Sequence, residues 1–381
     1  MSNDNQPMKI AYNSQIFRMQ EYGGISRYIV NLAQRVAREE QVVVSAPLYI
    51  NNYLAELPRD LVRGIRLSWR PKRGARLIDW AGTTIDRMII AGASPDVLHE
   101  TYYSYRSVGR ASIPKVLTVY DMIHERYADW FAADDDTARR KAAAVARASH
   151  VICISENTRR DLIELCAVDP AKVSVVYLGY EVLGYEVPGA GADTGGVASA
   201  MNKPGPYILY VGDRAGYKNF KALLRAYAGS AWLRENFRMV CFGGGRFRAD
   251  ELELMRELAI KPDRIEQVGG GDNVLAGYYR NAAAFVYPSL YEGFGIPPLE
   301  AMALGCPVIC SNTSSIPEVV GDAGEYFDPG QVESIRTSIE NVLQSSGRRA
   351  ELVGKGSRKC AEYSWDRCAN ETLKIYRELV R

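Results

Sequence analysis

Several features are scarce or absent in this chain of 381 residues, and each absence removes a class of protein. No apolar run approaches the roughly 20 residues that a membrane-spanning helix needs. The seven cysteines are scattered without a CxxC pair, which argues against a disulfide framework and against a zinc site. The segment from Met1 to Pro7 lacks the basic and apolar regions of a signal peptide. We therefore expect a cytoplasmic protein with reduced thiols, peripheral at most to the inner face of the membrane.

A strong charge of one sign is also absent. The formal net charge is +2 at pH 7, so the overall charge does not favour a nucleic acid as partner. Only three histidines occur, and neither they nor the acidic residues are spaced as metal ligands. We therefore expect no metal ion, no other cofactor and no nucleic acid.

A dinucleotide-binding fingerprint is missing as well. An oxidoreductase that uses a nicotinamide cofactor needs GxGxxG at a first strand-to-helix turn. The run Gly243-Gly244-Gly245 follows an apolar stretch, but it continues to Phe247 without a third spaced glycine. The sequence therefore counts against this class of enzyme.

What the chain does contain is a repeated alternation of short apolar runs with longer amphipathic stretches, which is typical of βα units around parallel sheets. This predicts an α/β fold with two Rossmann-like domains facing each other across a cleft and ligands at the carboxyl ends of the strands. We expect strands at residues 9–12, 42–44, 97–99, 116–119, 151–154, 207–211, 238–242, 284–287 and 307–310, and helices at 26–38, 137–148, 220–227 and 366–379.

A change in composition separates the two series of strands and helices. It shifts to glycine, alanine, proline and small polar residues near the middle of the chain, which is the signature of a linker. We expect a first domain at 1–185, a linker at 186–206 and a second domain at 207–362. Residues 363–381 end the chain with helical periodicity.

The most informative motif is a pair of carboxylates, Glu292 and Glu300, that bracket a glycine-rich turn before a helix. A helix N-terminus presents unpaired N–H groups and a positive dipole end, and Gly293 and Gly295 let a diphosphate come close. Glu292 on the loop and Glu300 about two turns into the helix can accept hydrogen bonds from hydroxyl groups. The motif predicts one site that binds phosphate and sugar hydroxyls together.

A second loop carries two cations. The strand at 207–211 runs into Gly212, followed by Arg214 and Lys218 before the next helix. A guanidinium and an ammonium group there can neutralise a diphosphate. An ordinary turn with solvated charges explains this loop equally well when it is considered alone.

Two places in the first half resemble ligand loops. Gly23 and Gly24 follow the first strand, with Ser26 as a candidate N-cap, although a lone Gly-Gly is usually a turn. Asp121 and His124 follow a later strand, where they can bind sugar hydroxyls or a phosphate. His99 also follows a strand, whereas we expect His150 to be structural.

Basic residues gather between Arg59 and Arg76, with Trp69 inside this segment and Trp80 just after it. Arginine mixed with tryptophan suits an anionic membrane surface or a pyrophosphate-bearing lipid, and it also suits a solvated loop. We favour the membrane surface.

With these residues identified, the chain resembles glycosyltransferase family 4, the group 1 glycosyl transferases of GT-B fold, over nearly its whole length. The Glu-x7-Glu element from Glu292 to Glu300 is the most specific mark. The other matching segments are Tyr287-Pro288-Ser289, Ala301-Met302-Ala303, Gly305-Cys306-Pro307-Val308 and Ser315-Ile316-Pro317-Glu318-Val319.

The resemblance implies a retaining, metal-independent transfer of a hexose from a UDP- or GDP-linked sugar to a glycan or lipid-linked acceptor in cell-surface polysaccharide synthesis. It also implies that the C-terminal helix crosses back to the first domain. Glu292 would hold the donor sugar, Glu300 the ribose, and Arg214 and Lys218 the diphosphate, with Asp121 and His124 as further catalytic candidates. The remaining donor contacts would come from Gly23, Gly24, Gly212, Gly293, Phe294, Gly295, Ile296 and Leu299.

Two positions depart from the family pattern. Asp213 stands directly after the glycine of the second-domain loop, where relatives often have arginine, and Arg214 follows it. Tyr120 stands before Asp121 where many relatives have histidine, while His124 lies three residues beyond Asp121. A nucleotide-sugar-binding protein of the same fold that has lost its chemistry remains the alternative, and it would bind a donor without releasing the nucleotide.

Overall fold

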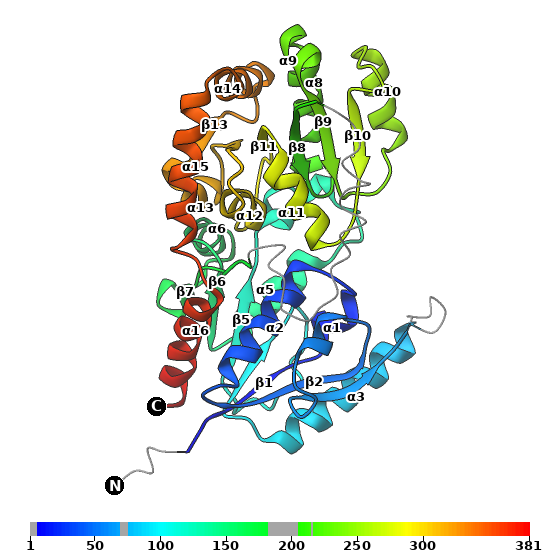
Figure 1. The fold of residues 1–381 in the computed structure, drawn as a ribbon. Helices are drawn as coiled ribbons and strands as arrows, with labels where there is room; N and C mark the ends of the chain where they lie inside the picture. The colour runs from blue at the N-terminus through cyan, green and yellow to red at the C-terminus, as the bar shows by residue number, and fades with distance from the viewer. Residues whose placement is uncertain (1–5, 69–74, 182–204, 215) are drawn as a thin grey trace. The chain divides into compact units, whose positions relative to one another are not determined.

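The computed structural model describes residues 6–68, 75–181, 205–214 and 216–381. Within this part the chain divides into two compact α/β units (Figure 1). The first unit combines residues 1–179 with 364–381, and the second spans 180–363. Most of the linker expected at 186–206 lies outside the described residues.

The sheet of the first unit is parallel, with the strand order β3-β2-β1-β4-β5-β6-β7. Its strands are β1 Lys9–Tyr12, β2 Gln41–Tyr49, β3 Val62–Arg66, β4 Val97–Glu100, β5 Lys115–Val119, β6 His150–Cys153 and β7 Val173–Val175. The helices are α1 Gln15–Met19, α2 Gly24–Val36, α3 Ala75–Ala93, α4 Ile123–Arg126, α5 Thr137–Arg147, α6 Glu156–Cys166 and α16 Trp365–Val380.

The second unit repeats this plan with the order β10-β9-β8-β11-β12-β13, again all parallel. Its strands are β8 Tyr207–Val211, β9 Arg238–Phe242, β10 Ile265–Val268, β11 Ala284–Tyr287, β12 Val308–Ser311 and β13 Gly324–Phe327. The helices are α8 Phe220–Ala228, α9 Ala231–Asn236, α10 Ala249–Glu257, α11 Asp272–Asn281, α12 Ile296–Ala303, α13 Ile316–Val320, α14 Val332–Gln344 and α15 Ser346–Cys360.

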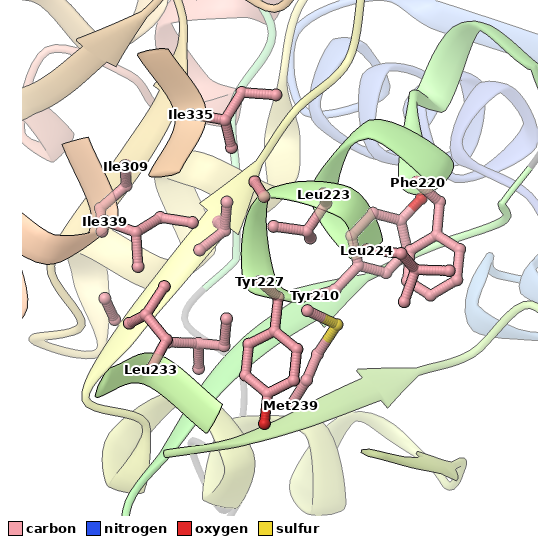
Figure 2. Close-up of a cluster of buried hydrophobic side chains, with 14 of the residues drawn as sticks. Tyr210, Phe220, Leu223, Leu224, Tyr227, Leu233, Met239, Ile309, Ile335 and Ile339 are labelled. Atoms are coloured by element: carbon pink, nitrogen blue, oxygen red, sulfur yellow. The ribbon is translucent and has the colours of Figure 1, made fainter. Parts of the chain in front are cut away.

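The central strands are apolar along their whole length because helices cover both faces of a parallel sheet. In the second unit, side chains of α8 pack against β8, β9 and α14 in one cluster (Figure 2). Leu223, Leu224 and Tyr227 of α8 are fully buried there, as are Ile335 and Ile339 of α14. This core fixes where α8 begins, and therefore fixes the loop that precedes it.

The order of the strands locates the ligand-binding edge of each unit. The order reverses between β1 and β4 in the first unit and between β8 and β11 in the second. Loops after the strands at such a switch point diverge and leave a crevice at the carboxyl ends. The loops after β8 and β11 carry Lys218 and Glu292.

Two local differences from the sequence expectations have clear causes. Helix α2 begins at Gly24 rather than at Ser26, so Ser26 is not the N-cap. Its Oγ donates instead to the Gly23 carbonyl at 3.0 Å, inside the first turn. Helix α3, which the sequence analysis missed, covers β2.

Candidate functional site

The loops after β8 and β11 contact each other through their backbones. Leu290 N donates to the Tyr217 carbonyl at 2.8 Å, which fixes one loop against the other. Lys218 lies in the short 3-10 turn Gly216–Lys218, and its Nζ is 2.7 Å from Oε1 of Glu292. Both side chains are largely buried, at 19% and 11% exposure. The structure thus brings together the cation and the carboxylate that the sequence placed 74 residues apart.

Two serines hold the backbone around Glu292. Glu292 N donates to Ser314 Oγ at 2.9 Å, and Ser315 Oγ donates to the carbonyls of Glu292 at 2.9 Å and Phe294 at 2.8 Å. Ser314 adopts a φ of 53°, which turns the chain so that both hydroxyls reach this loop. The position of Glu292 is therefore set by the loop that follows β12.

Helix α12 opens directly after this turn. Gly295 is its N-cap with a φ of 121°, a conformation that favours glycine, and Pro297 and Pro298 follow Ile296, the first residue of the helix. Glu300 lies in the second turn of α12 and accepts a hydrogen bond from the Tyr279 hydroxyl at 3.4 Å. Phe294 and Leu299 are buried at 3% and 0% exposure, so their side chains belong to the core.

Two buried tyrosines face the two glutamates. Burial raises the pKa of Tyr287 well above its ordinary value, and the carboxylate of Glu292 raises it further. Burial likewise raises the pKa of Tyr279, with a smaller contribution from Glu300. Both hydroxyls therefore stay protonated and act as hydrogen-bond donors toward these carboxylates.

The guanidinium of Arg214 lies inside the second unit, with 0% of its side chain exposed. Nε donates to Glu251 Oε1 at 3.0 Å, and Nη1 and Nη2 donate to the backbone carbonyls of residues 243–246 at 2.9 to 3.2 Å. The rings of Phe220 and Phe247 lie over it, 5.7 and 4.9 Å from Cζ. Each of its three nitrogens thus donates within the unit, and the expected diphosphate contact of Arg214 finds no support in this geometry.

Asp213, which departs from the family pattern, orders the loop through two hydrogen bonds. Its Oδ1 accepts from Arg214 N at 2.7 Å and from Arg248 Nη2 at 2.8 Å. Gly212, just before it, has a φ of 122° and donates its N–H to the Phe242 carbonyl at 2.9 Å. The loop therefore turns Arg214 inward toward α10 and leaves Lys218 at the carboxyl edge of the sheet.

The remaining expected residues belong to the first unit. Gly23 precedes α2 in extended backbone, and a Cβ there would lie 2.3 Å from Oε1 of Gln20, which in turn accepts from Ser26 N. Gly24 is the first residue of α2 and has open space around it. A Cβ at position 23 would therefore displace the flexible end of the Gln20 side chain and its hydrogen bond to Ser26 N.

Asp121 and His124 lie at the carboxyl end of β5, around a buried lysine. Lys141 Nζ donates to the Asp121 carbonyl at 2.7 Å and to Glu125 Oε2 at 2.8 Å. His124 stacks on Phe131 with ring centroids 3.9 Å apart. Its Nε2 is 3.8 Å from Asp135 Oδ2, whereas its buried Nδ1 has no hydrogen-bond partner in the described part of the chain.

The other two histidines are structural. His99 is completely buried, bonded to the Tyr376 hydroxyl through Nδ1 and to Thr118 Oγ1 at 2.9 Å through Nε2. Burial lowers the pKa of His99 to about 3, so it is neutral. His150 is partly buried and bonds Ser174 Oγ at 2.8 Å.

Sequence reasoning missed several residues that shape these sites. Glu251 and Lys141 are charged residues on helices, and nothing in their local pattern distinguishes them from solvated ones. Ser315 stood within a segment that matched the family, but without a role. Its hydroxyl acts on a turn 21 residues earlier, which only the folded structure reveals.

Metal-ligand clusters and membrane-spanning helices are both absent from the described part of the chain. The described residues contain no group of three or more histidine, cysteine, aspartate or glutamate side chains that could hold a metal ion. Among the helices in those ranges, none is both long and apolar enough to cross a membrane.

Two family models match the chain in succession. The model for glycosyltransferase family 4 matches residues 22–182, and the model for glycosyl transferases group 1 matches residues 197–359. Together they cover both units and end shortly before α16.

Curated relatives with sequence similarity include two mannosyltransferases of Escherichia coli. The chain is 38% identical to O-antigen chain mannosyltransferase B over 175 residues, which is 45% of this chain and 46% of that protein. It is 29% identical to serotype-specific mannosyltransferase WbdA over 251 residues, 63% of this chain and 30% of that protein. The chain thus spans less than half the length of these two relatives. D-inositol 3-phosphate glycosyltransferase of Kineococcus radiotolerans is 26% identical over 94% of this chain and 91% of its own length.

Solved structures share the fold over almost the whole chain. Sucrose-phosphate synthase from Thermosynechococcus elongatus aligns with a TM-score of 0.74 and 21% identity, covering 98% of this chain and 99% of its own. HepE of Anabaena, solved with UDP and glucose, aligns with a TM-score of 0.72 and 15% identity, covering 97% and 99%. These likenesses confirm the expected α/β fold of GT-B type.

Proposed function

Since this chain belongs to the group 1 glycosyl transferases of family 4, we propose that it moves a hexose from a nucleoside diphosphate sugar to a hydroxyl group of a glycan or lipid-linked acceptor. One observation carries the proposal. Lys218 Nζ lies 2.7 Å from Glu292 Oε1 at the carboxyl ends of β8 and β11, where the strand order reverses. A cation suited to phosphate and a carboxylate suited to sugar hydroxyls thus lie in contact at the edge of the sheet where ligands bind in such folds.

We assign the transferred sugar as mannose and the product as a cell-surface polysaccharide. The support is the names of the relatives, O-antigen chain mannosyltransferase B and serotype-specific mannosyltransferase WbdA, both of which extend beyond the aligned part. The donor is accordingly a nucleotide-linked mannose, with GDP as the first nucleotide to test and UDP as the second.

The proposed transfer retains the anomeric configuration. The bond from sugar C1 to the diphosphate oxygen breaks, and a bond from C1 to the acceptor oxygen forms on the same face. The acceptor proton passes to the departing phosphate oxygen, so no protein nucleophile is needed. Lys218 and the N–H groups of Gly295 and Ile296 at the start of α12 stabilise the charge that develops on the leaving diphosphate. The scheme uses no metal ion.

In this proposal Glu292 holds hydroxyls of the donor sugar and Glu300 holds the ribose, with backbone contacts from Gly293 to Ile296. Glu300 sits one turn farther along α12 than the N–H groups that face the phosphate. We also propose Asp121 and His124 as catalytic residues and Gly23 and Gly24 as further donor contacts.

The direct test is nucleotide release. The purified chain is incubated with GDP-mannose, UDP-glucose and a mannose-terminated oligosaccharide, with and without EDTA. We expect release of one nucleoside diphosphate together with a lengthened glycan, unchanged by EDTA, and an α-linkage by NMR when the donor is α-linked. Tight binding of a sugar nucleotide without any release of nucleotide, across a range of acceptors, would instead identify a binding protein that has lost its chemistry.

We also propose that the first unit rests on an anionic membrane. Trp80 and Met88 on α3 are 67% and 61% exposed, and Ile65 on the edge strand β3 is 68% exposed. Arginines at positions 59, 63, 66 and 87, on the same helix or in and near β3, are exposed as well. Arg63 and Met88 line one groove of about 650 Å³, so β3 and α3 form a continuous surface. Residues 69–74 of the basic segment lie outside the described residues. Aromatic and basic side chains in one surface suit lipid headgroups.

A further inference from the structure

The interior position of Arg214 has a consequence for the loop that it contacts. The glycines at 243, 244 and 245 all have a positive φ, of 83°, 67° and 67°. Their carbonyls, and that of Arg246, point to the guanidinium of Arg214. A loop of three glycines has no strong conformational preference of its own, so this cation and its partner Glu251 select the observed turn.

The same contacts decide where the N–H groups of this loop point. In a trans peptide the C=O and N–H bonds are nearly antiparallel. Because the carbonyls of residues 243–246 turn inward to Arg214, the N–H groups of residues 244–247 turn outward. Gly244, Gly245 and Arg246 are exposed. The loop therefore presents a row of backbone donors to solvent, in the manner of a backbone site for ligand oxygens.

The strand order gives this row its place in the site. Three loops leave the carboxyl edge of the sheet. The loop after β11 contains Glu292, the loop after β8 contains Lys218, and the loop after β9 contains residues 243–246. Neighbouring strands lie about 5 Å apart, so these three loops follow one another along the edge. If the sugar binds at Glu292 and the diphosphate at Lys218, the nucleoside lies next along this edge, at the loop after β9.

We propose that Arg214 and Glu251 form a positioning pair that shapes the Gly243–Arg246 loop, whose outward N–H groups bind the oxygen atoms of the donor's nucleoside. This inference rests on the proposed function. It assigns Arg214 a different role from that of Lys218, since Arg214 acts through the loop and Lys218 on the diphosphate itself.

The experiment compares nucleoside diphosphate with nucleoside monophosphate by calorimetry, using GDP and GMP or, if the chain prefers uridine, UDP and UMP. The variants are Arg214→Lys, Glu251→Gln and Gly244→Ala. A Cβ at position 244 would lie 2.6 Å from Nη1 of Arg214 and 2.8 Å from the Gly212 carbonyl, so Gly244→Ala disturbs the loop while both charges remain. It also serves if Arg214→Lys fails to fold, which circular dichroism reveals.

We expect all three variants to weaken the binding of both nucleotides by the same factor, about tenfold or more. This factor corresponds to the loss of charge-assisted or well-aligned hydrogen bonds. The ratio of the two affinities then stays as in the unchanged chain. The KM for the donor rises while kcat changes by no more than about threefold, because the loop contacts ground state and transition state alike. Lys218→Ala, in contrast, reduces the preference for diphosphate over monophosphate.

Lys221→Ala is the matched control. Lys221 of α8 and Asp250 of α10 form an exposed ion pair at 2.7 Å. Arg214 precedes α8 and Glu251 lies on α10, so the control pair joins the same part of the fold. Exposed pairs contribute little, so binding of both nucleotides should stay unchanged.

Two results would overturn this inference and leave the proposed function intact. One is a loss of diphosphate affinity in Arg214→Lys with monophosphate affinity intact, which makes Arg214 a phosphate ligand. The other is unchanged nucleotide binding in both Glu251→Gln and Gly244→Ala. If the unchanged chain binds neither GDP nor UDP, the proposed function fails, and the inference fails with it.

Discussion

At the scale of single residues, the decisive feature is that Lys218 and Glu292 are paired with each other. Their charges cancel at a separation of 2.7 Å, in a place where both side chains are mostly buried. Under the proposed function, a bound donor would change this balance, because sugar hydroxyls would give Glu292 new partners and the diphosphate would pair with Lys218. We therefore expect the Glu292 carboxylate to weaken the binding of a free nucleotide and to strengthen the binding of a nucleotide that carries its sugar.

This competition predicts opposite effects of two substitutions. Lys218→Ala should weaken free nucleoside diphosphate, whereas Glu292→Gln should bind it more tightly, because a negative charge near the phosphate is removed. Both substitutions should lower turnover sharply. For Lys218→Ala we expect about 100-fold, because the preorganised positive charge that stabilises the leaving group is lost. Calorimetry and nucleotide release measure the two effects. Near-normal turnover in Lys218→Ala would exclude its role at the leaving group.

The sequence alone singled out Glu292 and Lys218, because each lies in a glycine-containing loop that follows a strongly apolar strand, and their roles stay predictions. It was not enough to assign Arg214. The direction of that side chain depends on Glu251 and on a glycine loop 29 to 32 residues later. No local pattern reports such a contact.

At the scale of elements, α16 is joined to the first unit by polar contacts at several points. Arg35 of α2 bonds Asp366 at 3.0 Å, and Arg377 bonds Glu40 at 2.8 Å. In the interior, the Tyr376 hydroxyl connects to Tyr12 and to His99. A buried polar network of this kind is costly to leave unpaired, so it fixes the position of the helix against the sheet.

His99 makes the stability of this contact depend on pH. Burial lowers the pKa of His99 to about 3, whereas an unfolded histidine titrates near its ordinary value. Below that ordinary pKa the unfolded chain gains a proton that the native state does not bind, so the free energy of unfolding falls as the pH falls. Between about pH 7 and pH 5 the loss should be about 2 kcal/mol.

Urea unfolding followed by circular dichroism at both pH values checks this prediction. His99→Gln is the comparison, because glutamine offers a donor and an acceptor but does not titrate. Its loss of stability between the two pH values should be smaller by that amount. An equal pH dependence in both proteins would show that His99 already titrates normally in the native state.

Strands β1, β8, β9 and β11 have the predicted bounds, because each is a short apolar run ended by a turn residue. The predictions missed β3, β7, β10 and β13. All four are edge strands of their sheets, and β3 reads Val-Arg-Gly-Ile-Arg with most of its residues exposed. Strands with a solvated face lack the continuous apolar run that identifies a buried one.

At the scale of the whole molecule, the alternation of strands and helices was sufficient for the fold class. Two complete parallel sheets follow from it, and both family models and solved structures agree. The surface of α3 could not be predicted, because its exposed residues are separated along the chain and only the helix brings them to one side.

That surface predicts binding to anionic vesicles. The chain should sediment with vesicles of phosphatidylglycerol and phosphatidylcholine, less so at high salt, because each arginine near the lipid contributes about 1 kcal/mol. The double variant Trp80→Ala/Met88→Ala should bind about tenfold or more weakly, since its apolar contact area is lost. Its nucleotide affinity should not change.

Leu252→Ala is the control, because Leu252 is 46% exposed on α10 of the second unit. Equal sedimentation of the double variant and the unchanged chain would contradict a lipid contact through α3.

The discontinuity of the first unit also sets an order of events during synthesis. Residues 180–363 intervene between the body of that unit and α16, and they form a unit of their own. At about 5 to 20 residues per second, a ribosome needs roughly ten to forty seconds to translate this stretch. Throughout that interval, the surfaces of α2 and β4 that α16 will cover are exposed on the nascent chain. The second unit can therefore reach its native state first, and the first unit closes only when its last helix leaves the ribosome.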